Sequence, residues 1–74
     1  MSIRKQLIKA LARKYEAEIA QGKATVEIYL ENSVGIGEHP QHVEELDKAI
    51  SKISNAQENI DTLSKHFDYD EIPF

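Results

Sequence analysis

The clearest hydrophobic pattern lies in the second half of the chain, where apolar residues return every three or four positions. In a heptad register that begins at residue 43, every d position is apolar: Leu46, Ile53, Ile60 and Phe67. The a positions weaken along the segment, and three g positions widen the stripe: Val43, Ile50, Gln57 and Ser64 at a, and Ala49, Ala56 and Leu63 at g. Such a broad stripe is typical of a helix in a bundle. We therefore predict a helix over residues 40–66, with small alanines that permit close approach of a neighbouring helix.

The first part of the chain shows the same helical period over residues 2–32, and Ser2 is suited to cap its start. Gly22 interrupts the pattern at a cost of about 1 kcal/mol relative to alanine, so a bend there is the first departure from a continuous helix to expect. Residues 25–30 are β-branched and aromatic enough to form a strand instead. Helix is favoured, because a single strand would find no partner in this chain.

Residues 33–39 separate the two helical patterns and contain two of the three glycines. Asn32 is suited to closing the first helix, and Pro40 to the first turn of the second. Val34 and Ile36 would plug the end of the hairpin between them. The predicted fold is all-α, one domain over residues 1–74, with an antiparallel two-helix hairpin and a tail at residues 67–74. Its predicted core consists of Leu7, Ile8, Leu11, Tyr15, Ile19, Val26, Leu46, Ile50, Ile53, Ile60 and Leu63.

A hairpin of 74 residues cannot cover both of its apolar stripes, and a core of this size is marginal by itself. Two hairpins joined as a four-helix bundle would cover them. We therefore expect the chain to self-associate, with a homodimer as the simplest assembly.

The segment between the two predicted helices, residues 33–39, which we call the connector, holds few of the residues that a phosphate or metal site needs. Gly35 and Gly37 form only G-x-G, without a third glycine or a following Lys-Ser/Thr. His39 and His42 could supply two metal ligands, but zinc requires three or four. We expect no bound metal and no cofactor, and interpret the segment as the turn of the hairpin.

The composition argues against several further classes of protein, namely enzymes, membrane proteins and proteins secreted by a signal peptide. The chain has no cysteine, no distinctive Ser/His/Asp arrangement, and no apolar run near the roughly 20 residues of a membrane span. The start of the chain also lacks the apolar core of a signal peptide. We expect no enzymatic activity, no catalytic residue, no membrane insertion and no secretion by a signal peptide.

Charge is distributed unevenly, although the net charge is only -4. Residues 1–23 carry six basic side chains against two acidic ones, whereas residues 24–74 carry three against eleven. The basic group near the start of the chain predicts an alternative role in nucleic-acid binding: Arg4, Lys5, Lys9, Arg13 and Lys14. Pairing between this group and the acidic end of the second helix is a sufficient explanation of the asymmetry, so we do not expect nucleic acid to be the partner.

The tail alternates acidic and apolar residues, and Pro73 would stop any helix there. Short acidic-aromatic tails commonly dock into basic-rimmed grooves of other proteins. The residues predicted to contact such a partner are Phe67, Tyr69, Asp70, Ile72 and Phe74. The alternative is that the tail folds back onto the basic start of the first helix.

Residues 26–63 resemble a group of small, uncharacterised helical-hairpin proteins of contractile-tailed phages of marine bacteria. The similarity is carried by Tyr29–Asn32 and by Val34–Pro40, while Ser33 replaces a proline of that group. This resemblance implies a phage-encoded protein in the host cytoplasm or the virion, and transfers no activity. The expected function is a non-enzymatic interaction module, either a small assembly component or a host-directed adaptor that binds a phage or host protein.

Overall fold

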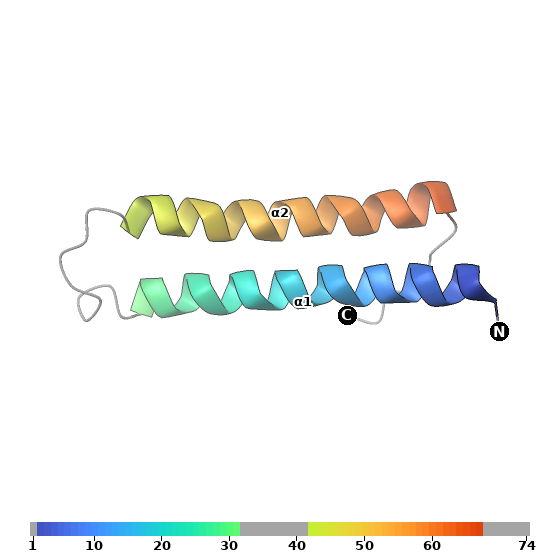
Figure 1. Ribbon diagram of the computed structural model, residues 1–74. Coiled ribbons are helices and arrows are strands. Elements are labelled where there is room, and N and C mark those ends of the chain that lie inside the picture. The colour runs from blue at the N-terminus through green and yellow to red at the C-terminus, as the bar shows by residue number, and fades with distance from the viewer. Residues whose placement is uncertain (1, 32–41, 68–74) are drawn as a thin grey trace.

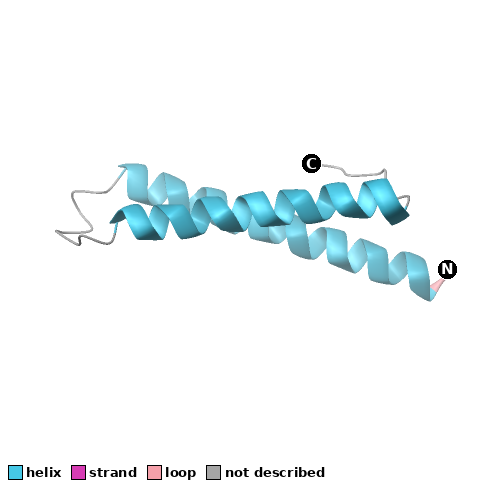
Figure 2. Cartoon of the chain, turned by 90° about the horizontal axis from the view of Figure 1, so that it is seen from above, coloured by secondary structure: helices cyan, strands magenta, loops and turns pink. Residues whose placement is uncertain are grey.

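The computed structural model describes residues 2–31 and 42–67, and each of these segments is almost entirely helical. Helix α1 runs over Ile3–Glu31 and helix α2 over His42–Phe67. The two helices lie side by side and run in opposite directions (Figure 1). Seen from above, they cross obliquely rather than lying parallel (Figure 2). The described residues contain no strand, which confirms the all-α prediction and the helical assignment of residues 25–30.

A capping serine marks the start of α1, and charged side chains stabilise both ends of α2. The backbone N–H of Lys5 donates to Ser2 Oγ at 3.1 Å, as predicted for an N-cap serine. In α2, Glu44 and Glu45 occupy the first turn, and Lys65 and His66 occupy the last. Each pair places charge of the sign that stabilises that end of the helix dipole.

Small residues dominate the contact between the helices, which we call the interhelical core. Its buried members are Ala12, Ile19 and Gly22 from α1, and Ala49, Ala56, Ile60 and Leu63 from α2. Ile60 has no exposed surface, and it packs with Ile19 and Ala56. Tyr15 and Ile53 cover this cluster from its sides. The alanines at g positions of α2 therefore face α1, as their size suggested.

Gly22 lies in the interhelical core, and α1 continues through it unbroken. A Cβ atom at Gly22 would lie 2.5 Å from Ile53 Cγ1 and 3.1 Å from the backbone oxygen of Ala49. The glycine is therefore required for close approach of α2 rather than for a break in the helix. Periodicity alone could not distinguish these two uses of glycine.

The predicted core is right for part of its members and wrong for three. Ile19, Ile60 and Leu63 are buried, and five others are half-buried: Ile8, Tyr15, Val26, Leu46 and Ile53. In contrast, Leu7, Leu11 and Ile50 are 61%, 40% and 52% exposed. The helices meet along the d and g positions of α2, so the a position Ile50 is rotated out of the contact. The predictions for Asn32, Val34, Ile36 and Pro40 lie outside the described residues.

Candidate interaction surface

Large apolar side chains remain on the surface of both helices. Eight of those in the described ranges are at least 40% exposed: Ile3, Leu7, Leu11, Ile28, Leu30, Val43, Ile50 and Phe67. Single exposed apolar residues are ordinary, but a group on one face indicates an interaction surface. The distribution of these side chains around the hairpin therefore decides whether they form such a surface.

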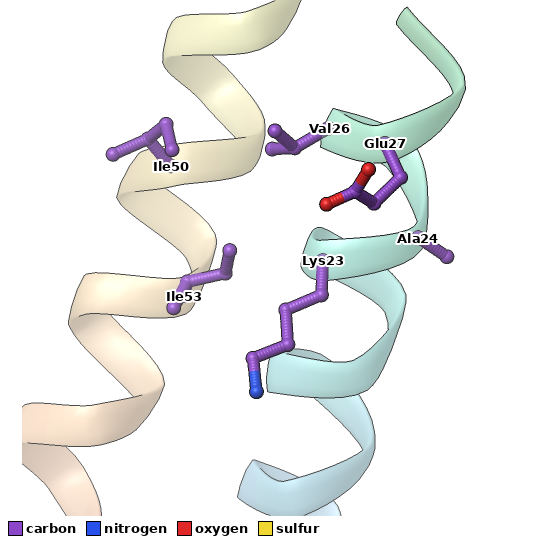
Figure 3. A pocket seen from close by; sticks show the side chains of 6 residues that line it. All are labelled: Lys23, Ala24, Val26, Glu27, Ile50 and Ile53. Carbon is purple, nitrogen blue, oxygen red and sulfur yellow. The ribbon is translucent and has the colours of Figure 1, made fainter. Parts of the chain in front are cut away.

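One group lies around an open groove of about 460 Å³ between α1 and α2. Its lining residues are Lys23, Ala24, Val26, Glu27, Ile50 and Ile53. Figure 3 shows Val26 and Ile53 between the helices, with Lys23 and Glu27 on the α1 side of the groove. Ile50 forms the α2 side and is more than half exposed.

Helical spacing extends this surface toward the connector. Leu30 follows Lys23 by seven residues, and Val43 precedes Ile50 by seven, so each lies on the same side of its helix. Leu30 is 63% exposed and Val43 75%. We call this surface the groove face and define it by Lys23, Glu27, Leu30, Val43 and Ile50, with Val26 and Ile53 at its base.

The opposite face of the hairpin is more polar at its centre. There the Lys52 ammonium donates to Gln21 Oε1 at 2.8 Å, which joins the two helices. Leu7 and Ile28 lie two heptads before and one heptad after Gln21, so they share its side of α1. Ile3 and Leu11 lie four residues before and after Leu7, so this face carries a second exposed apolar group near the start of α1. Gln21 and Lys52 separate that group from Ile28 at the centre of the face.

The predicted basic group is largely engaged within the hairpin. Arg4 Nη2 donates to the backbone oxygen of Phe67 at 3.3 Å, which connects the start of α1 to the end of α2. Arg13 pairs with Glu16 at 3.1 Å, and Lys14 with Glu18 at 2.8 Å. Lys5 and Lys9 are exposed. The basic start of α1 thus lies beside the end of α2 as expected, but the ion pairs among the described residues form within helices, not between them.

The ion pair between Lys14 and Glu18 also shifts the pKa of Lys14. The hydrogen bond to the Glu18 carboxylate, together with its negative charge, raises the pKa of Lys14 above its ordinary value of 10.5. Both side chains remain partly exposed, so this pair is a surface feature of α1. An arginine and a lysine that are already paired with carboxylates make a weaker phosphate-binding surface than five free cations would.

The predicted tail contacts fall mostly beyond the described residues. Phe67 is the last residue of α2 and is half exposed, whereas Tyr69, Asp70, Ile72 and Phe74 lie outside the described residues. His39 lies outside them as well. His42 packs edge-to-face against the Tyr29 ring at 5.8 Å. Within residues 2–31 and 42–67, no three His, Cys, Asp or Glu side chains are grouped to hold a metal ion.

Lys23 and Glu27 are not among the site residues predicted from the sequence. Their spacing of four is visible in the sequence, but their place beside Ile50 depends on how the two helices are rotated against each other. The signal that could have found them is Ala20, Lys23, Glu27 and Leu30 recurring at helical spacing next to the interhelical core.

Comparisons with known proteins identify no relative of the chain. No protein-family model, no curated protein and no solved structure matches the chain. Neither of the two described helices has the length and apolar character needed to cross a membrane.

Proposed function

We propose that the chain is a non-enzymatic, phage-encoded protein-interaction module that self-associates as a dimeric four-helix bundle. Within a phage it would serve as a small assembly component or as a host-directed adaptor. The phage assignment is supported by the resemblance of residues 26–63. The interaction role is supported by the structure's distribution of apolar side chains.

The observation that carries this proposal is the mismatch between what the hairpin buries and what it leaves exposed. Its interhelical core contains only three buried side chains larger than alanine, namely Ile19, Ile60 and Leu63. Eight larger apolar residues stay at least 40% exposed on the described helices. Burial of apolar surface is the main driving force of both folding and association, so covering these residues would stabilise an assembly.

Self-association is tested by sedimentation of the full chain over a range of micromolar concentrations. A dimer that dissociates on dilution supports the proposal, and the apparent stability should rise with protein concentration in parallel. A stably folded chain that remains a monodisperse monomer throughout that range would refute it.

The tail is proposed as the second binding element, which docks a phage or host protein. The test is a pull-down from infected-host lysate with the full chain, a chain that ends at His66 and a chain that ends at Phe67. The last is the matched control, because it keeps the Phe67 oxygen that Arg4 contacts, there as part of the C-terminal carboxylate. A partner that is bound by the full chain and lost from both truncated chains supports docking through residues 68–74. A partner retained by both truncated chains would refute a docking role for the tail.

A further inference from the structure

We infer that the groove face pairs with the groove face of a second copy around a two-fold axis, with α1 against α1 in antiparallel orientation. The inference rests on the proposed self-association and specifies which surface carries it. It is drawn from the arrangement of one cation and one anion with apolar side chains around them: Lys23, Glu27, Ala20, Leu30, Val43 and Ile50.

The charges on the groove face are self-complementary. Lys23 and Glu27 are one helical turn apart and both line the groove (Figure 3). A two-fold axis perpendicular to α1 at the level of residue 25 places each Lys23 opposite Glu27 of the second copy. An isologous interface of this kind repeats every contact twice, so the two copies gain two ion pairs.

The same axis also matches the apolar residues of α1. Ala20 lies on the groove face because it precedes Lys23 by three residues and Glu27 by seven. Residues equally distant from position 25 face each other, so Leu30 meets Ala20 of the second copy. A large exposed side chain thus meets a small one, which is the combination that allows helices to interdigitate.

The α2 contacts follow without a further assumption. Gly22 lies against Ala49 and Ile53, and Tyr29 lies against His42, so residue 25 is at the level of residues 46–48 in α2. Val43 and Ile50 lie on either side of that level. The axis therefore brings Val43 onto Ile50 of the second copy, and the reverse, which covers two of the most exposed apolar residues of α2.

One residue opposes the pairing and provides an independent test. Asp47 lies at the level of the axis, four residues after Val43 and three before Ile50, so the two Asp47 carboxylates approach each other. Asp47→Asn should tighten dimerisation severalfold at low ionic strength, because it removes like-charge repulsion at the interface. Weaker dimerisation of this variant would contradict the axis.

Charge reversal gives the decisive experiment. Lys23→Glu places two carboxylates in each facing pair, and Glu27→Lys places two ammonium groups there. Each variant alone should dimerise about tenfold more weakly than the wild-type chain, or worse, at low ionic strength. The mixture of the two variants should form a heterodimer, because every facing pair is again one cation and one anion. The double variant Lys23→Glu/Glu27→Lys should likewise regain dimerisation.

Glu58→Lys is the matched control, since Glu58 is exposed and lies about 16 Å along α2 from Asp47, well beyond the level of the axis. It makes the same change in net charge as Glu27→Lys, and it should neither weaken the homodimer nor pair selectively with Lys23→Glu. Sedimentation and native mass spectrometry of a mixture with one chain isotope-labelled would resolve homodimers from heterodimers.

The outcomes separate this inference from the proposal beneath it. A wild-type chain that stays monomeric refutes self-association altogether. A dimeric wild-type chain whose single variants dimerise equally well, or whose mixture forms no heterodimer, overturns the groove-face interface alone. Weakened single variants together with a restored mixture establish it, because only an axis that exchanges positions 23 and 27 produces that pattern.

Discussion

Replacing Gly22 with alanine sets two known effects against each other at one position. Alanine is favoured over glycine in a helix interior by about 1 kcal/mol. The new methyl group, however, would lie 2.5 Å from Ile53 Cγ1, 3.1 Å from Ile53 Cδ1 and 3.1 Å from the backbone oxygen of Ala49. Because the first of these distances is far below van der Waals contact, α2 or the Ile53 side chain has to move.

The steric effect should outweigh the gain in helix propensity. Overpacking of a close contact typically costs about 1–3 kcal/mol. Ile53 is β-branched and stiff about χ1 in a helix, so moving its Cγ1 requires an unfavourable rotamer or a shift of the backbone. We expect Gly22→Ala to lower the free energy of unfolding by about 1 kcal/mol net, with the melting temperature falling by about 4–8 °C for a domain of this size.

Truncating Ile53, the side chain that obstructs the new methyl group, should turn Gly22→Ala from a destabilising into a stabilising substitution. In an Ile53→Ala background the two Ile53 atoms nearest to the new methyl group are gone, while the Ala49 backbone oxygen stays 3.1 Å away. There Gly22→Ala should stabilise the hairpin by most of the helix-propensity gain. The matched control is Ala17→Gly at an exposed position of α1, which measures that propensity in the same helix without a packing change.

The assay is chemical denaturation followed by circular dichroism, at one protein concentration for all variants because association shifts apparent stability. The four chains form a double-mutant cycle, whose coupling energy isolates the contact between positions 22 and 53. If Gly22→Ala stabilised the wild-type and the Ile53→Ala chains equally, the close approach at Gly22 would not exist and the reasoning would fail.

Three further predictions concern separate features of the hairpin. Ile60→Ala should cost about 2–5 kcal/mol in unfolding free energy. At a protein concentration where the chain is monomeric, Ile50→Ala should change this free energy by less than about 0.5 kcal/mol, although it should weaken dimerisation at higher concentration. Denaturation and sedimentation of both variants would check this, and equal losses of monomer stability would contradict the burial of Ile60 and the exposure of Ile50. The Lys14–Glu18 pair raises the pKa of Lys14 in the folded chain. From neutral pH upward, its contribution to stability is therefore present up to about pH 10.5 and is lost as the pH rises through the raised pKa. Over that range the stability difference between the wild-type and Glu18→Gln chains should shrink only at the alkaline end, and a difference that disappears near neutral pH would exclude this pair as its cause. The third prediction concerns the nucleic-acid alternative. Because Arg4, Arg13 and Lys14 already contact other groups of the chain, we expect no salt-dependent binding of DNA or RNA in a gel-shift assay. Binding at low salt that is lost in a Lys9→Ala/Arg13→Ala chain would instead support that alternative.

Local features of the fold were predictable because local interactions determine them. The three-four spacing predicted both helices to within a few residues, and Ser2 does cap α1. The surface pairs Arg13–Glu16 and Lys14–Glu18 also follow from helical spacing alone. Each of these depends on residues within about one turn of one another, which a single sequence displays directly.

The rotation of the helices against each other was not predictable in the same way. The stripe of α2 includes a, d and g positions, so two different pairs of positions could have faced α1. The structure selects d and g, where Ala49 and Ala56 allow α1 to approach and Gly22 receives Ile53. The placement of Leu11 and Ile50, and with it the groove face, depends on this choice. The tail contacts depend on a partner or on residues 68–74, which no helical period constrains.

The close contact and the exposed surface therefore have a single physical cause. Small residues such as Ala12, Gly22 and Ala56 let the helix backbones approach, and dispersion contacts increase as the gap closes. The same close approach leaves little volume between the helices, so larger side chains such as Leu11 and Ile50 are excluded from the core and lie at its edges. A substitution that separates the helices, such as Gly22→Ala, should consequently alter the groove face and weaken dimerisation in addition to lowering stability. A replacement confined to the edge, such as Ile50→Ala, should affect dimerisation alone.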